Sequence, residues 1–183
     1  LEIIEREVPL LANRRRGLYR IRDCIFDFWY SFVFSHRQAI EMENLVVGSI
    51  DMNPYFGKQF EVFVRNEFAR MIFPGHTIGR WWYREREIDL IAIRESDASI
   101  VFGECKWGAL TEREARGVLT RLVQKAEYAR HDRYPNEGFC LIAGDIGGKA
   151  QLREEGFLVY DLADIEARYT AGQPSFTSPH LSR

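Results

Sequence analysis

The clearest periodic pattern of apolar residues lies between positions 53 and 73 of the chain. Large apolar side chains recur there at three- and four-residue spacing: Phe56, Phe60, Phe63, Val64, Phe68 and Met71. This is the spacing of one helix face. Asn53 can cap such a helix, Pro54 suits its first turn, and Pro74 followed by Gly75 ends it. The pattern therefore predicts a helix over 53–73.

Shorter apolar runs follow this helix and alternate with helical segments. The runs that predict strands are 76–83, 87–94, 99–107, 139–143 and 157–160. A charged amphipathic helix is predicted over 111–130, where Thr111 and Glu114 have the spacing of a capping box. Further helices are predicted near 148–155 and from Asp161. Such alternation indicates an α/β fold with a central mixed sheet and helices on both faces.

The first fifty residues have a different pattern. Residues 1–22 predict a β-hairpin, with one strand around 8–10, a turn at 13–17 and a second strand over 18–21. Asp23 can cap a helix through about Phe34, and this helix is apolar on nearly all sides. We therefore expect it to be wedged between other elements.

These patterns divide the chain into three parts. Residues 1–52 form the hairpin and a helical connector, 53–170 form the α/β domain, and 171–183 form a disordered tail. The sequence begins at Leu1, which suggests a fragment of a longer protein. It contains neither a signal peptide nor an apolar run long enough to span a membrane.

Composition narrows the function. The net charge of −2 lowers the expectation of tight, unaided binding to nucleic acid, although arginines crowd one early segment: Arg14, Arg15, Arg16, Arg20 and Arg22. Cys24, Cys105 and Cys140 have neither disulfide nor zinc spacing, so we expect reduced core cysteines and a cytoplasmic protein.

Three charged residues interrupt two otherwise apolar strands. Glu104 and Lys106 share one face of the strand 99–107, because side chains two apart point the same way. Asp89 lies in the preceding strand, and an antiparallel pairing of the two strands would bring it close to Glu104.

Two interpretations of these residues remain open. A buried ion pair with Lys106 is the simpler one, but two carboxylates and one lysine leave a charge of −1 that burial makes costly. A divalent cation would remove the imbalance, and oxygen ligands favour Mg²⁺ or Mn²⁺.

The order of these elements and charges resembles the PD-(D/E)xK nuclease superfamily. Asp89 matches its aspartate, and Glu104 with Lys106 matches its E-x-K, whereas Ile88 replaces the usual proline. The resemblance implies a restriction-endonuclease-like three-layer fold. It also implies an acid in the preceding helix, for which Glu61 is preferred over Glu67.

A second motif lies in the helix that follows. Gln124 and Tyr128 have the Q-x-x-x-Y spacing of RecB-like members and share one helix face. An ordinary amphipathic surface helix explains the same pattern equally well.

A narrower resemblance covers residues from about 5 to 165. The segments 19–23 and 26–32, together with those around Glu61, Asp89 and Glu104, resemble the C-terminal part of archaeal-type P-loop ATPases. That part ends in a nuclease-like domain of unknown function of the DUF234 type. On this resemblance, residues 1–22 are the remnant of a winged helix, whose arginines would contact DNA phosphates or only solvate a turn.

The ATPase core is not expected in this chain. The glycine-rich stretch 144–150 has the wrong spacing for a P-loop, and Ala150 stands where a magnesium-binding hydroxyl is required. We therefore expect no ATP site here and an upstream ATPase domain as partner.

The resemblance implies metal-dependent hydrolysis of DNA. Asp89, Glu104, the carbonyl of Cys105 and Glu61 would hold Mg²⁺ or Mn²⁺, and Lys106 would orient or deprotonate water. Gln124 and Tyr128 would position the nucleic-acid strand. An RNA-processing or toxin nuclease would use the same site. The alternative is an inactive module for DNA docking or ATPase assembly, and a homo-oligomer is left open.

Overall fold

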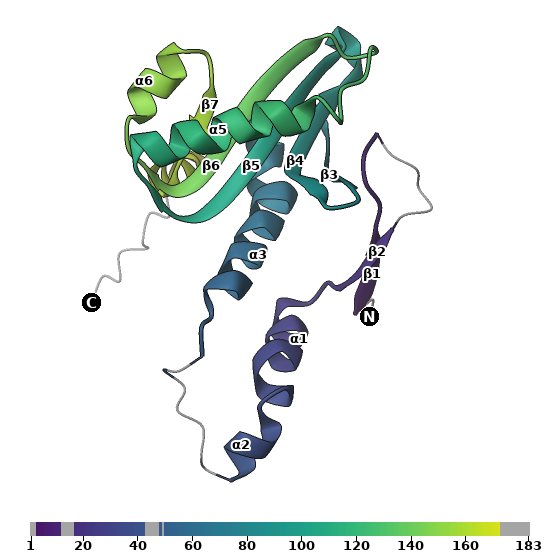
Figure 1. Ribbon diagram of the computed structural model, residues 1–183, viewed down its shortest axis with the longest axis vertical. Coiled ribbons are helices and arrows are strands. Elements are labelled where there is room, and N and C mark those ends of the chain that lie inside the picture. Colours follow the sequence, from purple (N-terminus) through teal and green to yellow (C-terminus); the bar gives the residue numbers. More distant parts are fainter. Residues whose placement is uncertain (1–2, 12–16, 43–47, 49, 173–183) are drawn as a thin grey trace, which may run out of the picture.

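A five-stranded mixed sheet forms the centre of the computed structural model, which describes residues 3–11, 17–42, 48 and 50–172 (Figure 1). The strands lie in the order β3-β4-β5-β6-β7. Their bounds are Thr77–Tyr83, Arg86–Arg94, Ser99–Leu110, Asn136–Ile146 and Leu158–Tyr160. The first three strands pair antiparallel, and β6 and β7 join parallel to β5. The predicted strands and their mixed pairing are confirmed.

Helices cover both faces of this sheet. One face packs on α5 (Glu112–Ala126) and α6 (Lys149–Glu154), whose buried leucines meet apolar residues of the strands. The other face packs on α3 (Asn53–Phe63), its continuation and α7 (Leu162–Gly172). Figure 1 shows α5 crossing in front of the sheet and α3 descending from it. This three-layer arrangement confirms the expected restriction-endonuclease-like fold.

The helix predicted over 53–73 is present as three consecutive helical segments, of which the middle one is π-helical. Beyond α3 it runs as a π-helical segment η4 (Val64–Phe68) and ends as α4 (Ala69–Ile72). The prediction that Asn53 caps it is wrong. Met52 is the N-cap residue, and the Asn53 N–H instead donates to Asp51 Oδ1 at 3.0 Å.

A β-bulge interrupts the pairing of β4 with β3. Gly79 pairs with Ile91 and Trp81 with Ile88, so Asp89 and Leu90 together lie opposite the single residue between Gly79 and Trp81. Ile88 and Ile91 consequently pack in the same apolar cluster although they are three residues apart. Bulges of this kind re-aim side chains at the end of a ladder, and here the residue concerned is Asp89.

The N-terminal segment forms a two-stranded hairpin, β1 (Ile4–Glu7) with β2 (Leu18–Ile21). The strand expected around 8–10 is therefore placed wrongly. Those residues instead lie against the edge of β3, where the Leu10 N–H donates to the Arg80 carbonyl at 2.9 Å. Of the turn predicted at 13–17, residues 13–16 lie outside the described residues.

The helix predicted from Asp23 is present as α1 (Cys24–Phe28) and the π-helical segment η2 (Trp29–Phe34), followed by α2 (Arg37–Glu41). Asp23 Oδ1 caps it, as expected, by accepting two backbone N–H groups. The expectation of a wedged helix is wrong, because most of its apolar side chains are exposed: Ile25, Phe26, Phe28, Trp29, Tyr30 and Phe34. Cys24 is exposed as well, whereas the other two cysteines are buried, and all three are free thiols.

A buried carboxylate joins α1 to α3. Asp27 Oδ2 accepts from Gln59 Nε2 at 2.7 Å, and Lys58 Nζ lies 3.2 Å from Oδ1. The Tyr55 hydroxyl adds a hydrogen bond to the Cys24 carbonyl. Division of the chain at residue 52 stays a prediction, as does the winged-helix origin of the hairpin.

Two further observations concern the C-terminal end of the described chain and the length of its helices. The disordered tail is predicted from residue 171, but residues 171 and 172 belong to α7, and 173–183 lie outside the described residues. None of the described helices has the length and apolar character needed to cross a bilayer.

The capping box of α5 gives a first prediction. Thr111 Oγ1 accepts from the Glu114 N–H, and Glu114 Oε2 accepts from the Thr111 N–H. Thr111→Ala leaves the Glu114 N–H without this acceptor, so the free energy of unfolding should fall by about 1 kcal/mol. Urea unfolding measures it. Thr120→Ala is the matched control in the same helix, where alanine's higher helix propensity should leave stability unchanged or slightly raised; an equal loss in both variants would contradict the capping argument.

Candidate active site

Asp89 lies where β4 and β5 stop pairing. The ladder between these strands ends at the pair Leu90 and Gly103. One step further on, Asp89 Oδ2 accepts the Cys105 N–H at 2.9 Å and takes the place of the next backbone acceptor. The carboxylate is only 6% exposed, so this hydrogen bond offsets part of the cost of burying it. Asp89 Oδ1 accepts no hydrogen bond from the described residues.

Glu104 lies on the neighbouring strand and holds two lysines. Lys106 Nζ is 2.9 Å from Glu104 Oε1, and Lys125 Nζ is 2.9 Å from Oε2 and 3.1 Å from Oε1. Glu104 is 7% exposed, whereas both lysine side chains are about one-third exposed or more (40% for Lys106 and 31% for Lys125). Lys125 comes from α5, so the ion pairs tie this helix to β5.

Glu61 approaches Asp89 from α3. Arg65, one turn further along the helix, is buried and lies with Nη1 3.8 Å from Glu61 Oε2. The same Nη1 donates to the Asp89 carbonyl at 3.1 Å. Glu7 of β1 lies 3.7 Å from Arg65 Nε, which connects the hairpin to the site.

Burial first, and then a neighbouring carboxylate, raises the pKa values of Glu61 and Asp89. Burial, followed by the charge of Asp89, raises the pKa of Glu61 from 4.5 to about 7. Burial and then Glu104 raise the pKa of Asp89 from 3.8 to about 6. For Lys106, burial disfavours the charged form, but Glu104 outweighs it and raises the pKa of the ammonium. Asp89 and Glu61 therefore lack full compensation although three cations lie nearby.

The donor atoms fit an oxygen-liganded divalent cation in kind. Asp89 Oδ1 and both Glu61 oxygens accept no hydrogen bond from the described residues, and burial keeps the Cys105 thiol protonated by raising its pKa. Cys105 would therefore bind a hard cation through its carbonyl oxygen and not through its sulfur. The geometry does not yet form a complete metal site. Two lysines contact Glu104, and the described residues contain no cluster of three or more His, Cys, Asp or Glu side chains arranged for a metal.

The remaining predicted residues form no hydrogen bond or ion pair with Asp89 or Glu104 in the described part of the chain. Glu67 is exposed, whereas its rival Glu61 lies beside Arg65. Gln124 is exposed and lines a groove with Arg116 and Phe157, without a hydrogen bond to the described residues. Tyr128 is 59% exposed and stacks under Arg86, whose Cζ lies 4.0 Å from the ring centroid. The role of Gln124 and Tyr128 in positioning a nucleic-acid strand stays a prediction.

Two residues of the site were missed from the sequence. Lys125 borders the apolar face of its helix, three residues after Leu122 and four before Ala129, which are both buried. Arg65 follows Glu61 by four residues inside an apolar run. A charge on the buried face of a helix is the signal that could have found both.

The fold and this cluster of carboxylates and lysines define a three-layer α/β domain with a buried acidic site. The model of the DUF234 family, described as archaea bacterial proteins of unknown function, matches residues 29–118. The DUF234 assignment expected from the sequence is confirmed over that segment.

Other similarities cover parts of longer proteins. The uncharacterized protein MJECL04 of Methanocaldococcus jannaschii is 32% identical over 176 residues, 90% of this chain and 39% of that protein. The glutamyl-Q tRNA(Asp) synthetase of Chromobacterium violaceum is 36% identical over 80 residues, 44% of this chain and 26% of that protein. The chain therefore spans well under half the length of these relatives.

Two solved structures align with about half of the chain. One is a repair endonuclease from Pyrococcus abyssi, with a TM-score of 0.35, 22% identity and coverage of 55% of this chain and 42% of that one. The other is a complex of EndoMS with double-stranded DNA, with a TM-score of 0.35, 21% identity and coverage of 57% and 43%.

The raised pKa of Glu61 predicts how stability depends on pH. The folded state binds a proton that the unfolded state releases between pH 4.5 and about 7, so Glu61 lowers the free energy of unfolding as pH rises through this range. Glu61→Gln removes the titration. It should therefore be more stabilising at pH 8 than at pH 4.5 by about 1–2 kcal/mol, measured by urea unfolding with a chelator present.

Glu67→Gln is the control for this measurement, because Glu67 is exposed on the same helical rod. Its effect on stability should be the same at both pH values. A Glu61→Gln effect that does not change with pH would contradict the placement of Glu61 beside Asp89.

Proposed function

We propose that this domain hydrolyses phosphodiester bonds of nucleic acid, with DNA as the substrate, in the manner of a metal-dependent nuclease. The observation that carries the proposal is the meeting of Asp89, Glu104 and Lys106 where β4 and β5 diverge, with Glu61 and Arg65 supplied by the helix across them. Buried acids with raised pKa values beside lysines are typical of functional sites.

Asp89, Glu61, Glu104 and the Cys105 carbonyl would hold the cation, Mg²⁺ or Mn²⁺. When bound, the cation supplies Lewis acidity that lowers the pKa of water and stabilises negative charge on the phosphate. Cation binding would relieve the repulsion that raises the pKa values of Asp89 and Glu61. Glu104 would exchange at least one lysine contact for the cation.

The chain's own residues then have separate tasks. The Cys105 N–H fixes the Asp89 carboxylate in one orientation. Lys106 is 40% exposed and charged, so it can lie against a phosphate, orient a water and offset the charge that develops in the transition state. Arg65 fixes the backbone of Asp89 from the α3 side.

One observation favours a second candidate, a nuclease-fold module without catalysis. Lys125 Nζ lies 2.9 Å from Glu104 Oε2, so two lysines already neutralise the acid that a cation would need. Such a module would dock on DNA or join an assembly. In either case the greater length of the relatives leaves room for the upstream P-loop ATPase that the sequence resemblance implies.

Cleavage assays test the catalytic proposal. The wild-type protein should cut plasmid or single-stranded DNA when Mg²⁺ or Mn²⁺ is added, whereas Asp89→Asn and Lys106→Met should each lower the rate by about 100-fold or more. Glu67→Gln should cut at the wild-type rate, since Glu67 is exposed and makes no hydrogen bond or ion pair with the described residues of the site. If the wild type and both site variants leave the same background, catalysis by this domain is refuted.

Manganese titration by calorimetry separates the two candidates. The enzyme should bind Mn²⁺, and Asp89→Asn should abolish binding. Lys125→Met frees Glu104 from one cation and removes a repelling charge, so it should tighten binding by about tenfold, or about 1.4 kcal/mol. Lys149→Met is the control, because Lys149 pairs with Asp161 and Asp164 elsewhere. Absence of Mn²⁺ binding in the wild type would favour the module.

A further inference from the structure

A groove of about 680 Å³ runs along α5 from the candidate active site. Its lining includes Lys106 at the site and Arg113, Gly117 and Arg121 on the helix. Lys106 is thus shared between the groove and the site, so a strand held at the lysine would continue directly into the groove.

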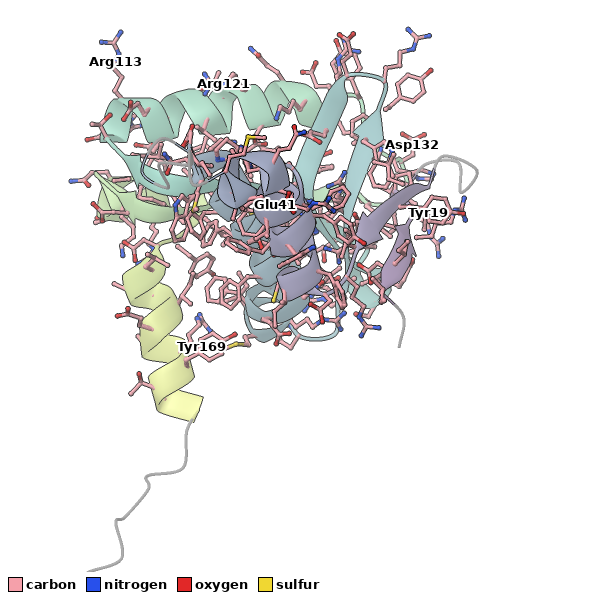
Figure 2. The ribbon with its side chains drawn as sticks, turned by 90° about the horizontal axis from the view of Figure 1, so that it is seen from below. Tyr19, Glu41, Arg113, Arg121, Asp132 and Tyr169 are labelled. Atoms are coloured by element: carbon pink, nitrogen blue, oxygen red, sulfur yellow. The ribbon has the colours of Figure 1, made fainter. Side chains whose placement is uncertain are left out.

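The two arginines of this groove differ from others on and near the same helix. Arg116 binds Glu155 through two hydrogen bonds of 2.7 Å and also contacts Glu112, and Arg130 binds Glu137. Arg113 and Arg121 are exposed, and neither makes an ion pair with any residue in the described part of the chain. Figure 2 shows Arg113 extending from α5 into solvent, with Arg121 further along the same helix.

Acids do not neutralise this groove. Its lining contains one carboxylate, Glu114, and both the N–H and the hydroxyl of Thr111 donate to that carboxylate at the helix cap. The groove therefore presents guanidinium groups whose charge is available to an anion, next to a site that already holds Lys106 and Lys125. Unpaired arginines in a groove are suited to bidentate binding of phosphate.

Gly117 opens the surface between the two arginines. A Cβ at this position would lie 3.5 Å from Arg121 Nη1, which shows that the Arg121 guanidinium lies over the glycine. Eight residues of helix separate Arg113 from Arg121, which is about 12 Å along the axis. One strand of B-DNA advances about 3.4 Å along the duplex axis per phosphate, so with α5 parallel to that axis the pair spans three to four nucleotides of one strand.

We propose that the groove lined by Lys106, Arg113, Gly117 and Arg121 is a phosphate track. It holds the sugar-phosphate backbone of one DNA strand that flanks the bond at Lys106. The inference rests on the proposed function for its ligand and goes beyond it by naming the surface and the residues that bind. Because the contacts are to phosphates, the track positions the strand without reading its sequence.

The test is the salt dependence of DNA binding. Fluorescence anisotropy with a short labelled duplex, in a chelator that prevents cleavage, gives Kd between about 50 and 200 mM salt. Each phosphate contact steepens the slope of log Kd against log salt by about 0.9. Arg113→Gln and Arg121→Gln should each reduce the slope by about that amount, and the double variant by about 1.8. Over this salt range each lost contact corresponds to about a 3.5-fold change in the Kd ratio.

Arg116→Gln is the matched control, since it removes the same charge from the same helix but from an arginine that acids already neutralise. It should leave the slope unchanged. The proposal is overturned if Arg113→Gln and Arg121→Gln behave like Arg116→Gln, or if the wild type does not bind the duplex. A reduced slope without any cleavage in magnesium would refute the proposed catalysis and leave the track standing, so the two failures are distinguishable.

Discussion

The hydrogen bond from the Cys105 N–H to the Asp89 carboxylate is the contact on which the candidate site depends. It lies at the end of the β4–β5 ladder, where the bulge in β4 has re-aimed Asp89. Without the bulge, Asp89 would continue the alternation of the strand, and its carboxylate would not replace a backbone acceptor. The Arg65 guanidinium supports the same residue through its carbonyl. One local irregularity thus sets the position of the acid around which the others gather.

Burial explains why this cluster of carboxylates needs cations nearby. Asp89 and Glu104 are each less than 8% exposed, and apolar clusters cover both sides of the sheet beside them. Isolated carboxylates in such surroundings are costly. Lys106 and Lys125 offset this cost for Glu104, whereas Asp89 and Glu61 retain raised pKa values. The part of the site that remains uncompensated is therefore the Asp89–Glu61 side, and a cation would stabilise that side most.

Much of the fold could be predicted from the sequence, because alternating apolar runs and a capping box are local signals. The strands of the sheet, the helix after them and the proximity of Asp89 to Glu104 followed from such signals. The bulge could not be predicted from the sequence, because its position depends on how β4 pairs with β3. The ion pair of Lys125 with Glu104 could not be predicted either, because it depends on which face of α5 packs against β5. The preference for Gln124 and Tyr128 came from spacing alone, which does not say which helix face meets the sheet.

The distribution of charge on α5 reconciles an acidic chain with the proposed binding of DNA. The net charge of −2 is a sum over surfaces whose local charges differ. On the groove beside Phe157, Glu112 and Glu155 neutralise Arg116. On the groove beside Lys106, the arginines have no acidic partner among the described residues, and the one lining acid is engaged at the helix cap. Local potential, rather than net charge, determines where a polyanion docks. The acids that make the chain acidic overall therefore do not oppose a DNA strand at the groove beside Lys106, which leads into the carboxylate–lysine site.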